Sequence, residues 1–376
     1  RPVAVALAIN SPGALFHSPV GAGPGGALGQ FTSGQLSSLT FESTVQAAGL
    51  TFTGTTNMNG TTITTTGDQV YNGAVFLGSD TTLEGNDITF NLDMNSSLRD
   101  RSLTINTVGG GTTRFNGPVG LITPLRNLTT NADGVTILGN GTLITGGDQN
   151  YNDLVVLAAS VNLAASNVTF GQTVNSDSDA TARSLSIDTT NEGVTTFGGT
   201  VGELHSLLRL TTNSDGTTRI NGGSVFTTSI QAYNDDAILG AVTTLVGGGV
   251  SFGGTLNSDF NARALTINTL NGGQTTFNGT VGNSGPLASI TTNADGTTRF
   301  FGSTIRTTGD QSYGDAIVLG ADVAITGNDV TFSSTIDSTA LLPTASLTVN
   351  TIGNGVTTFN GVVGGSNTVK SITTNA

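Results

Sequence analysis

Four short segments place an aspartate or asparagine directly before a serine, at nearly constant intervals along the chain. Each follows a phenylalanine by a few residues, and arginine follows the first three. Carboxylate, amide and hydroxyl oxygens beside a guanidinium could bind a sugar or a cation. The alternative, an Asx or Ser/Thr turn that closes on its own backbone, stays open. We expect these segments to form a row of loops along one edge of the molecule, and the residues of this predicted loop row are Asn95, Asn175, Asp177, Asn257, Asp259 and Asp337.

Side chains suited to catalysis are few. The two histidines, His17 and His205, lie in no recognisable motif with a nucleophile. The carboxyl pair Asp235 and Asp236 could act as general acid and base on a glycosidic bond, but solvated turns explain such pairs more simply. The chain has no cysteine, which excludes thiolate metal sites and disulfides. We therefore expect no catalysis, no cofactor and no metal site, with a polysaccharide-active enzyme as a remote alternative.

The charge of the chain limits its partners. The net charge is −13 and only 10% of the residues are charged. Without a basic patch to neutralise phosphates, nucleic-acid binding is not expected. No apolar run approaches the roughly 20 residues that span a bilayer, so no membrane span is expected either.

The chain is built from an internal repeat of about eighty residues. A Gln-x-Tyr step recurs at intervals of 80, 82 and 80 residues, and a Leu-[Thr/Ser]-[Ile/Val]-[Asn/Asp] step keeps the same order and period. A fixed period of this kind is typical of stacked repeat architectures. The first marker comprises Gln69/Tyr71, Gln149/Tyr151, Gln231/Tyr233 and Gln311/Tyr313.

Shorter patterns within the repeat indicate strands. Phenylalanines 252, 277 and 300 each end a short β-branched or polar run, about 24 residues apart. Between residues 316 and 332, apolar residues alternate with small or polar ones, which is the period of a half-buried strand. Gly, Asn and Asp break these runs as turn residues do. We therefore predict an all-β parallel solenoid with three to four coils per repeat, and we expect Phe277 to point inward.

The predicted organisation has two parts. Residues 1–35 are expected to form an apolar strand and a Pro/Gly-rich linker. Residues 36–376 are expected to form the solenoid. Its predicted segments are a degenerate start at 36–56 and units of about 57–130, 131–212, 213–292 and 293–376.

The first apolar segment places Val3, Val5, Leu7 and Ile9 on one side of a strand. An unpaired strand can add to the exposed edge of another sheet. One prediction is therefore that the chain polymerises head to tail through these four residues. The alternatives are that the segment caps its own chain, or that the array is part of a longer protein.

The segments Leu265–Gly282 and Leu287–Gly296 resemble the β-strand repeats of large bacterial surface proteins. Filamentous-haemagglutinin-like adhesins and autotransporter passenger domains are the groups they are most similar to. The resemblance covers residues 36–376 and implies a right-handed parallel β-helix exported to the cell surface. The Asn-Pro-rich secretion signature of two-partner haemagglutinins is absent. We therefore expect a structural shaft or filament outside a bacterial cell, and alternatively an adhesin that binds glycan or matrix through the loop row.

Overall fold

The fold was determined as a computed structural model that describes residues 5–22, 26–34, 38–339 and 345–375. Every regular element in these ranges is a β-strand, and all the strand pairs are parallel. The chain divides into two compact units, Arg1–Asp177 (unit 1) and Ser178–Ala376 (unit 2). The predicted all-β parallel solenoid is confirmed in each unit. Within the described ranges, no helix has the length and apolar character needed to cross a membrane.

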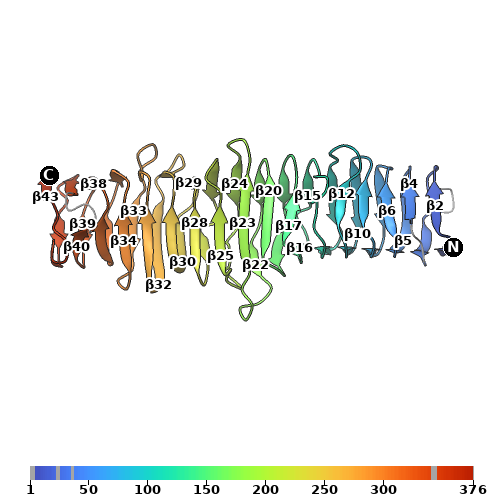
Figure 1. The fold of residues 1–376 in the computed structure, drawn as a ribbon, viewed down its shortest axis with the longest axis horizontal. Coiled ribbons are helices and arrows are strands. Elements are labelled where there is room, and N and C mark those ends of the chain that lie inside the picture. Colours follow the sequence, from blue (N-terminus) through green and yellow to red (C-terminus); the bar gives the residue numbers. More distant parts are fainter. Residues whose placement is uncertain (1–4, 23–25, 35–37, 340–344, 376) are drawn as a thin grey trace. The chain divides into compact units, whose positions relative to one another are not determined.

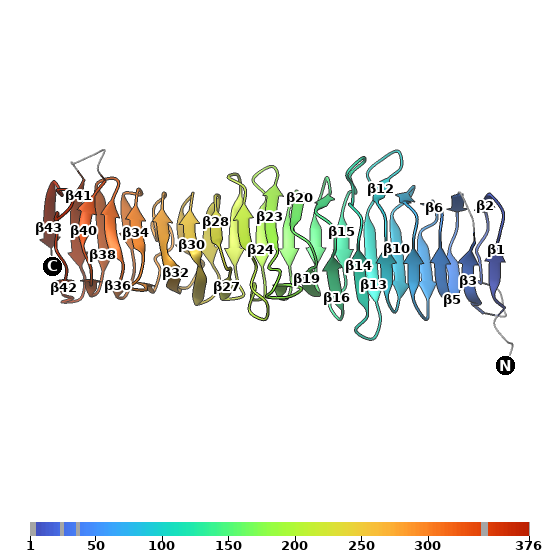
Figure 2. The same cartoon turned by 60° about the horizontal axis from the view of Figure 1, so that its bottom comes forward.

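Unit 1 has three stacks of strands, which the chain visits in turn (Figures 1 and 2). Stack A contains the first half of β5 (Val45–Phe52), β7 (Thr62–Thr65), β10 (Thr81–Gly85), β13 (Leu103–Thr107), β15 (Leu128–Thr130), β18 (Gln149–Tyr151) and β21 (Val168–Phe170). Stack B contains β1 (Leu7–Ile9), β3 (Leu28–Ser33), the second half of β5, β8 (Gln69–Tyr71), β11 (Ile88–Phe90), β14 (Thr112–Phe115), β16 (Val135–Leu138), β19 (Leu154–Leu157) and β22 (Val174–Ser176). Stack C contains β2 (Gly13–Phe16), β4 (Ser38–Phe41), β6 (Thr55–Met58), β9 (Val75–Leu77), β12 (Met94–Ser96), Val119, β17 (Thr142–Ile144) and β20 (Val161–Ala165).

Unit 2 repeats this arrangement with stacks D, E and F. Stack D contains β23 (Ser184–Thr189), β25 (Arg209–Thr212), β28 (Ile230–Tyr233), the second halves of β30 (Thr243–Phe252) and β32 (Ala264–Phe277), β34 (Thr297–Phe300), β37 (Ala316–Leu319) and β40 (Ile336–Ser338). Stack E contains β24 (Val194–Phe197), β26 (Thr217–Ile220), β29 (Asp236–Leu239), β31 (Leu256–Ser258), Val281, β35 (Thr304–Arg306), β38 (Val323–Gly327), β41 (Ser346–Thr351) and β43 (Ser371–Asn375). Stack F contains Val201, β27 (Ser224–Phe226), the first halves of β30 and β32, β33 (Ser289–Thr292), β36 (Gln311–Tyr313), β39 (Val330–Phe332) and β42 (Thr357–Phe359).

The alternation in the sequence produces the core. In β37 and β38, Ile317, Leu319, Val323 and Ile325 are buried, while the residues between them face outward. Successive side chains of a strand point to opposite faces, so each strand contributes every second residue to the interior. The prediction that Phe277 points inward is confirmed, because its side chain is fully buried.

The eighty-residue repeat is not a whole number of coils. From Gln69 in stack B to its equivalent Gln149 in stack A, the chain passes through eleven stack positions, or three and two-thirds coils. The same holds from Gln231 in stack D to Gln311 in stack F. This agrees with the predicted three to four coils per repeat. Equivalent residues of successive repeats within a unit therefore lie on different faces.

The aromatic residues show this displacement directly. In unit 1, one ladder occupies stack B, where the ring centroids of Tyr71 and Phe90 are 5.1 Å apart and those of Phe90 and Phe115 are 5.3 Å apart. The next ladder starts in stack A with Tyr151 and Phe170, at 5.4 Å. Each repeat thus places one stack of rings in the interior and moves it to a neighbouring face in the next repeat.

The N-terminal region differs from the prediction of a strand and an irregular linker. Both β2 and β3 lie within residues 1–35 and pair in parallel with strands of the solenoid, and the Phe16 ring stacks on Phe41 at 5.5 Å. Outward and inward positions alternate in both strands, and Phe16 and Phe31 lie at inward positions, while glycine and proline occupy neighbouring segments. The predicted start of the solenoid at residue 36 lies outside the described residues.

The four residues predicted to contact a neighbouring chain are placed as follows. Leu7 and Ile9 lie in β1, which pairs with β3 of the same chain, and both are half-buried. Val5 is 71% exposed. Val3 lies outside the described residues. Residues 7–9 thus pair within their own chain, which was the alternative to pairing with a neighbouring chain. Head-to-tail association stays a prediction.

Candidate functional site

The Asx side chains of the predicted loop row hold a loop of the following coil. The amide oxygen of Asn95 accepts hydrogen bonds from the backbone N–H groups of Ile122 (2.9 Å) and Thr123 (3.3 Å). The amide oxygen of Asn257 does the same for Ser284 (3.0 Å) and Gly285 (3.2 Å). These side chains thus supply acceptors for backbone N–H groups of the next coil, which is a structural task.

Asp337 has the same role, and Asn175 and Asp177 differ from each other in burial. A carboxylate oxygen of Asp337 accepts from the N–H groups of Ser366 (2.8 Å) and Asn367 (3.0 Å). Asn175 is buried, and its amide lies 3.4 Å from the Thr173 hydroxyl. Asp177 is exposed.

The loop that these side chains hold begins with a Val-Gly pair. In the third repeat Val281 bridges Leu256 and Ile305, and Gly282 follows with φ +70°. A Cβ on Gly282 would lie 2.2 Å from the Arg306 carbonyl oxygen, so the chain can turn there only with glycine. Sequence analysis missed the link between the Asx residue and this loop. The available signal was the Val-Gly pair that recurs about 25 residues after each Asx-Ser step.

The loop row is not continuous along one edge, and the prediction that it is was wrong. In unit 1, Asn95 lies in stack C and Asn175 in stack B. In unit 2, Asn257 lies in stack E and Asp337 in stack D. A repeat of three and two-thirds coils moves each copy to another face. Ligand binding by a single loop stays a prediction, but a multivalent row is not formed within either unit.

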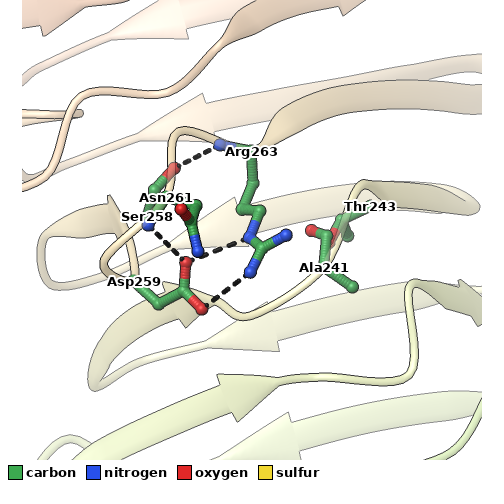
Figure 3. Close-up of polar contacts among 6 residues, drawn as sticks. All are labelled: Ala241, Thr243, Ser258, Asp259, Asn261 and Arg263. Carbon is green, nitrogen blue, oxygen red and sulfur yellow. Dashed lines mark hydrogen bonds and ion pairs between the residues drawn. The ribbon is translucent and has the colours of Figure 1, made fainter.

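Figure 3 shows the ion pair that Asp259 of this row forms with Arg263. The carboxylate of Asp259 accepts two hydrogen bonds from the Arg263 guanidinium, both 3.0 Å, and a third from the Asn261 backbone N–H at 3.0 Å. The Ser258 hydroxyl accepts from the Arg263 N–H at 2.9 Å. The hydrogen bonds from Arg263 lower the pKa of Asp259, and the same pairing raises the pKa of Arg263. The loop therefore satisfies its own polar groups.

Replacing Asn257 by alanine should destabilise the chain by roughly 1–3 kcal/mol, because the backbone N–H groups of Ser284 and Gly285 lose their shared acceptor. Hydrogen exchange should quicken at Ser284 and Gly285, which donate those bonds. The matched control is Asp259→Asn, which weakens a partly exposed ion pair in the same loop and should change stability less. Equal effects of the two changes would contradict the anchoring role, and loss of sugar or cation binding in the control would support a ligand site.

The Gln-x-Tyr marker forms a buried hydrogen-bonded pair in every repeat. In the third, the Tyr233 hydroxyl donates to the amide oxygen of Gln231 at 3.0 Å. The Gln231 amide nitrogen donates to the carbonyls of Val225 (3.1 Å) and Val246 (2.9 Å). Burial raises the pKa of Tyr233, so its hydroxyl keeps its proton. The marker joins three neighbouring segments and presents nothing to a ligand.

Three aspartates that sequence analysis did not single out as a set are buried in the interior. They are Asp153, Asp235 and Asp315, spaced 82 and 80 residues apart. The carboxylate of Asp235 accepts from the hydroxyls of Thr212 (2.8 Å) and Thr218 (2.8 and 2.9 Å). Its neighbour Asp236 faces outward and accepts from the Thr255 N–H at 2.7 Å, so the two carboxyls do not face one reaction centre.

Recesses occur on the described surface of both units. One in unit 2 has a volume of about 450 Å³ and is acidic, with Glu192, Asp215, Asp235 and Asp236 among its lining residues. One in unit 1 has a volume of about 360 Å³ and is mainly apolar. Within the residues that the structure describes, no three His, Cys, Asp or Glu side chains are arranged to hold a metal ion.

Each of the two histidines contacts one carboxylate. The Nδ1 atom of His17 lies 2.6 Å from a Glu42 oxygen, and that of His205 lies 3.2 Å from an Asp179 oxygen. His17 is largely exposed and His205 is partly exposed. Neither contact includes a hydroxyl nucleophile.

One face in each unit carries a column of outward-facing, mainly hydroxyl side chains on successive strands, called a file below. Register pairing brings Thr244, Thr266, Thr291, Ser312, Thr331 and Thr358 together on stack F. A similar file on stack A comprises Thr62, Thr82, Thr104, Thr129, Asn150 and Thr169. Threonine pairs on neighbouring strands stabilise a sheet surface, which accounts for these files without a ligand.

Comparison of the chain with protein-family models, with curated proteins and with solved structures finds no match to any of them.

Proposed function

We propose that this chain is a non-catalytic structural protein that forms a stiff shaft outside a bacterial cell. Mechanical support is the function that the geometry favours, since each unit has a buried interior of stacked, mainly apolar side chains bounded by short parallel strands. A location outside the cell is supported by the resemblance of its repeats to those of bacterial surface proteins.

One observation carries the proposal: the polar residues that recur in every repeat bind the chain's own backbone. The amide of Gln231 joins three segments, and Asn257 holds the loop of the next coil. Repetition of these residues is explained by the need to satisfy buried polar groups in each repeat. A repeated ligand site would instead present its polar groups outward on a common face.

Immunogold electron microscopy of the native material tests the proposal. A structural shaft should be labelled on or outside the cell envelope, as spikes or filaments. Label confined to the cell interior would contradict it. A glycan array and an assay for reducing-end release address the alternatives, because specific glycan binding would favour an adhesin and released reducing ends would favour an enzyme. Association with further copies of the chain stays a prediction that the same images would test.

A further inference from the structure

We propose that Asp153, Asp235 and Asp315 are proton-binding groups of the folded solenoid, so that mild acid strengthens the fold. The three carboxyls occupy equivalent positions of successive repeats, and each is buried, with an exposed fraction of 0%, 2% and 1% in that order. In the first repeat the equivalent position is Gly73, which carries no titratable group.

The hydrogen bonds to these carboxyls come from neutral groups. The Thr130 hydroxyl lies 2.8 Å from Asp153 and the Thr136 hydroxyl lies 2.9 Å from both of its oxygens. Asp315 accepts from the Gly296 N–H and the Thr298 hydroxyl, both at 2.9 Å. Hydroxyl groups can donate to a carboxylate or accept from a carboxylic acid, so the sites fit either protonation state.

The titratable groups that lie near these carboxyls are acids. Asp133 and the buried Tyr151 lie near Asp153, and Asp295 lies near Asp315. Asp236 and Tyr233 lie near Asp235, whose recess also contains Glu192 and Asp215. Among the described residues, no lysine, arginine or histidine forms an ion pair with any of the three. A buried charge without a partner is strongly unfavourable, and the group escapes this by taking up a proton.

Neighbouring hydroxyls in the interior are also incompletely satisfied. Thr113, Thr195 and Thr275 are the register partners of Thr136, Thr218 and Thr298 in the preceding coil, and their hydroxyl oxygens have no hydrogen-bond partner. The polar groups around each carboxyl therefore include no surplus donor that would favour the charged form. In the first repeat, where Gly73 replaces the aspartate, the hydroxyl of Thr56, the equivalent of Thr136, has no partner.

The sign of the pH effect follows from the direction of the pKa shift. Burial raises the pKa of all three carboxyls, and the hydrogen bonds from threonine or backbone offset only part of this. The folded chain then binds more protons than the unfolded chain, whose aspartates have a pKa of about 3.9. Stability should rise as pH falls through the folded pKa and should be fully gained near the unfolded value. Asp259 and Asp310, whose pKa values are lowered, act in the opposite direction at still lower pH.

The test compares the wild type with Asp153→Asn, Asp235→Asn and Asp315→Asn by denaturant unfolding between pH 8 and pH 4.5. Asparagine is isosteric and neutral, so each variant should be more stable than the wild type at pH 8. One such carboxyl can change the unfolding equilibrium constant of the wild type by up to roughly tenfold per pH unit. Each variant should lose the contribution of the carboxyl that it replaces. Glu84→Gln is the control for net charge, because Glu84 lies on the outer side of β10 and should leave the slope nearly unchanged.

A variant less stable than the wild type at pH 8, with the wild-type slope retained, would overturn the proposal. If a variant does not fold, a carbon-13 NMR titration of the wild-type aspartate carboxyls decides the question. Three carboxyls that titrate above the range of the exposed aspartates would support the proposal. Titration of all the carboxyls near or below about 4 would refute it.

Discussion

Replacing Phe277 by alanine is expected to lower the free energy of unfolding by roughly 3–5 kcal/mol. The ring is fully buried and stacks between Phe252 at 5.5 Å and Phe300 at 5.7 Å. Its removal leaves a cavity in the middle of a ladder, and both neighbouring rings lose a stacking partner. The parallel strands on either side hold the backbone in place, so the cavity cannot readily close. Urea denaturation followed by circular dichroism measures the loss.

Phe260→Ala provides the matched control for this change. The Phe260 side chain is fully exposed in the turn after β31, so its loss should alter stability by no more than about 0.5 kcal/mol. A silent Phe277→Ala variant, or one no worse than the control, would show that the aromatic ladder does not hold the interior together.

Replacing Gln231 by leucine should destabilise the chain by roughly 2–4 kcal/mol, although leucine is apolar and similar in size. The change leaves the buried Tyr233 hydroxyl without its acceptor, and the carbonyls of Val225 and Val246 without their side-chain donor. A buried polar group that loses its partner is more costly than one that was never present.

The double variant Gln231→Leu/Tyr233→Phe separates the two contributions. Removing the orphaned hydroxyl should recover part of the lost stability, so the two changes should not be additive. Urea denaturation of both single variants and the double variant provides the comparison. Strict additivity would mean that the recurring Gln-x-Tyr pair is not a coupled unit, and would weaken the structural explanation of the repeat.

The alternation of residues along each strand predicted the fold well. Alternation between residues 316 and 332, and aromatic residues at the ends of short strands, were sufficient to predict parallel coils and an inward Phe277. Both features depend only on which side of a strand a residue faces, and the sequence records that directly. Residues 13–16 show the same alternation, with Ala14 and Phe16 more buried than Gly13 and Leu15. The nearby proline and glycine nevertheless favour a linker, which is why this strand is missing from the prediction.

The faces of the solenoid could not be predicted in the same way. The strands of a repeat cannot be counted reliably from the sequence. Val281 pairs in stack E through isolated bridges, outside any strand, and β32 is one continuous strand that belongs to both stack F and stack D. If the number of strands per repeat is wrong by one, every equivalent residue is assigned to the wrong face. For this reason Asn257 and Asp337 were expected on one edge, although they lie in different stacks. The partners of Asn257 lie 27 and 28 residues ahead, in the next coil, so no local spacing relates them.

A pair of engineered cysteines tests the coil register from which the structural account follows. The chain has no native cysteine, so no native thiol competes with an added pair. Thr291 and Ser312 are register partners on the outer side of stack F, and Ser289 lies two residues before Thr291 on the same side. Mild oxidation should close a disulfide in Thr291→Cys/Ser312→Cys with the fold retained, and should fail in Ser289→Cys/Ser312→Cys, whose Cα atoms are about 8 Å apart in a parallel register. Equal closure of both pairs, or closure of the second alone, would contradict the register and with it the displacement of each repeat to a new face.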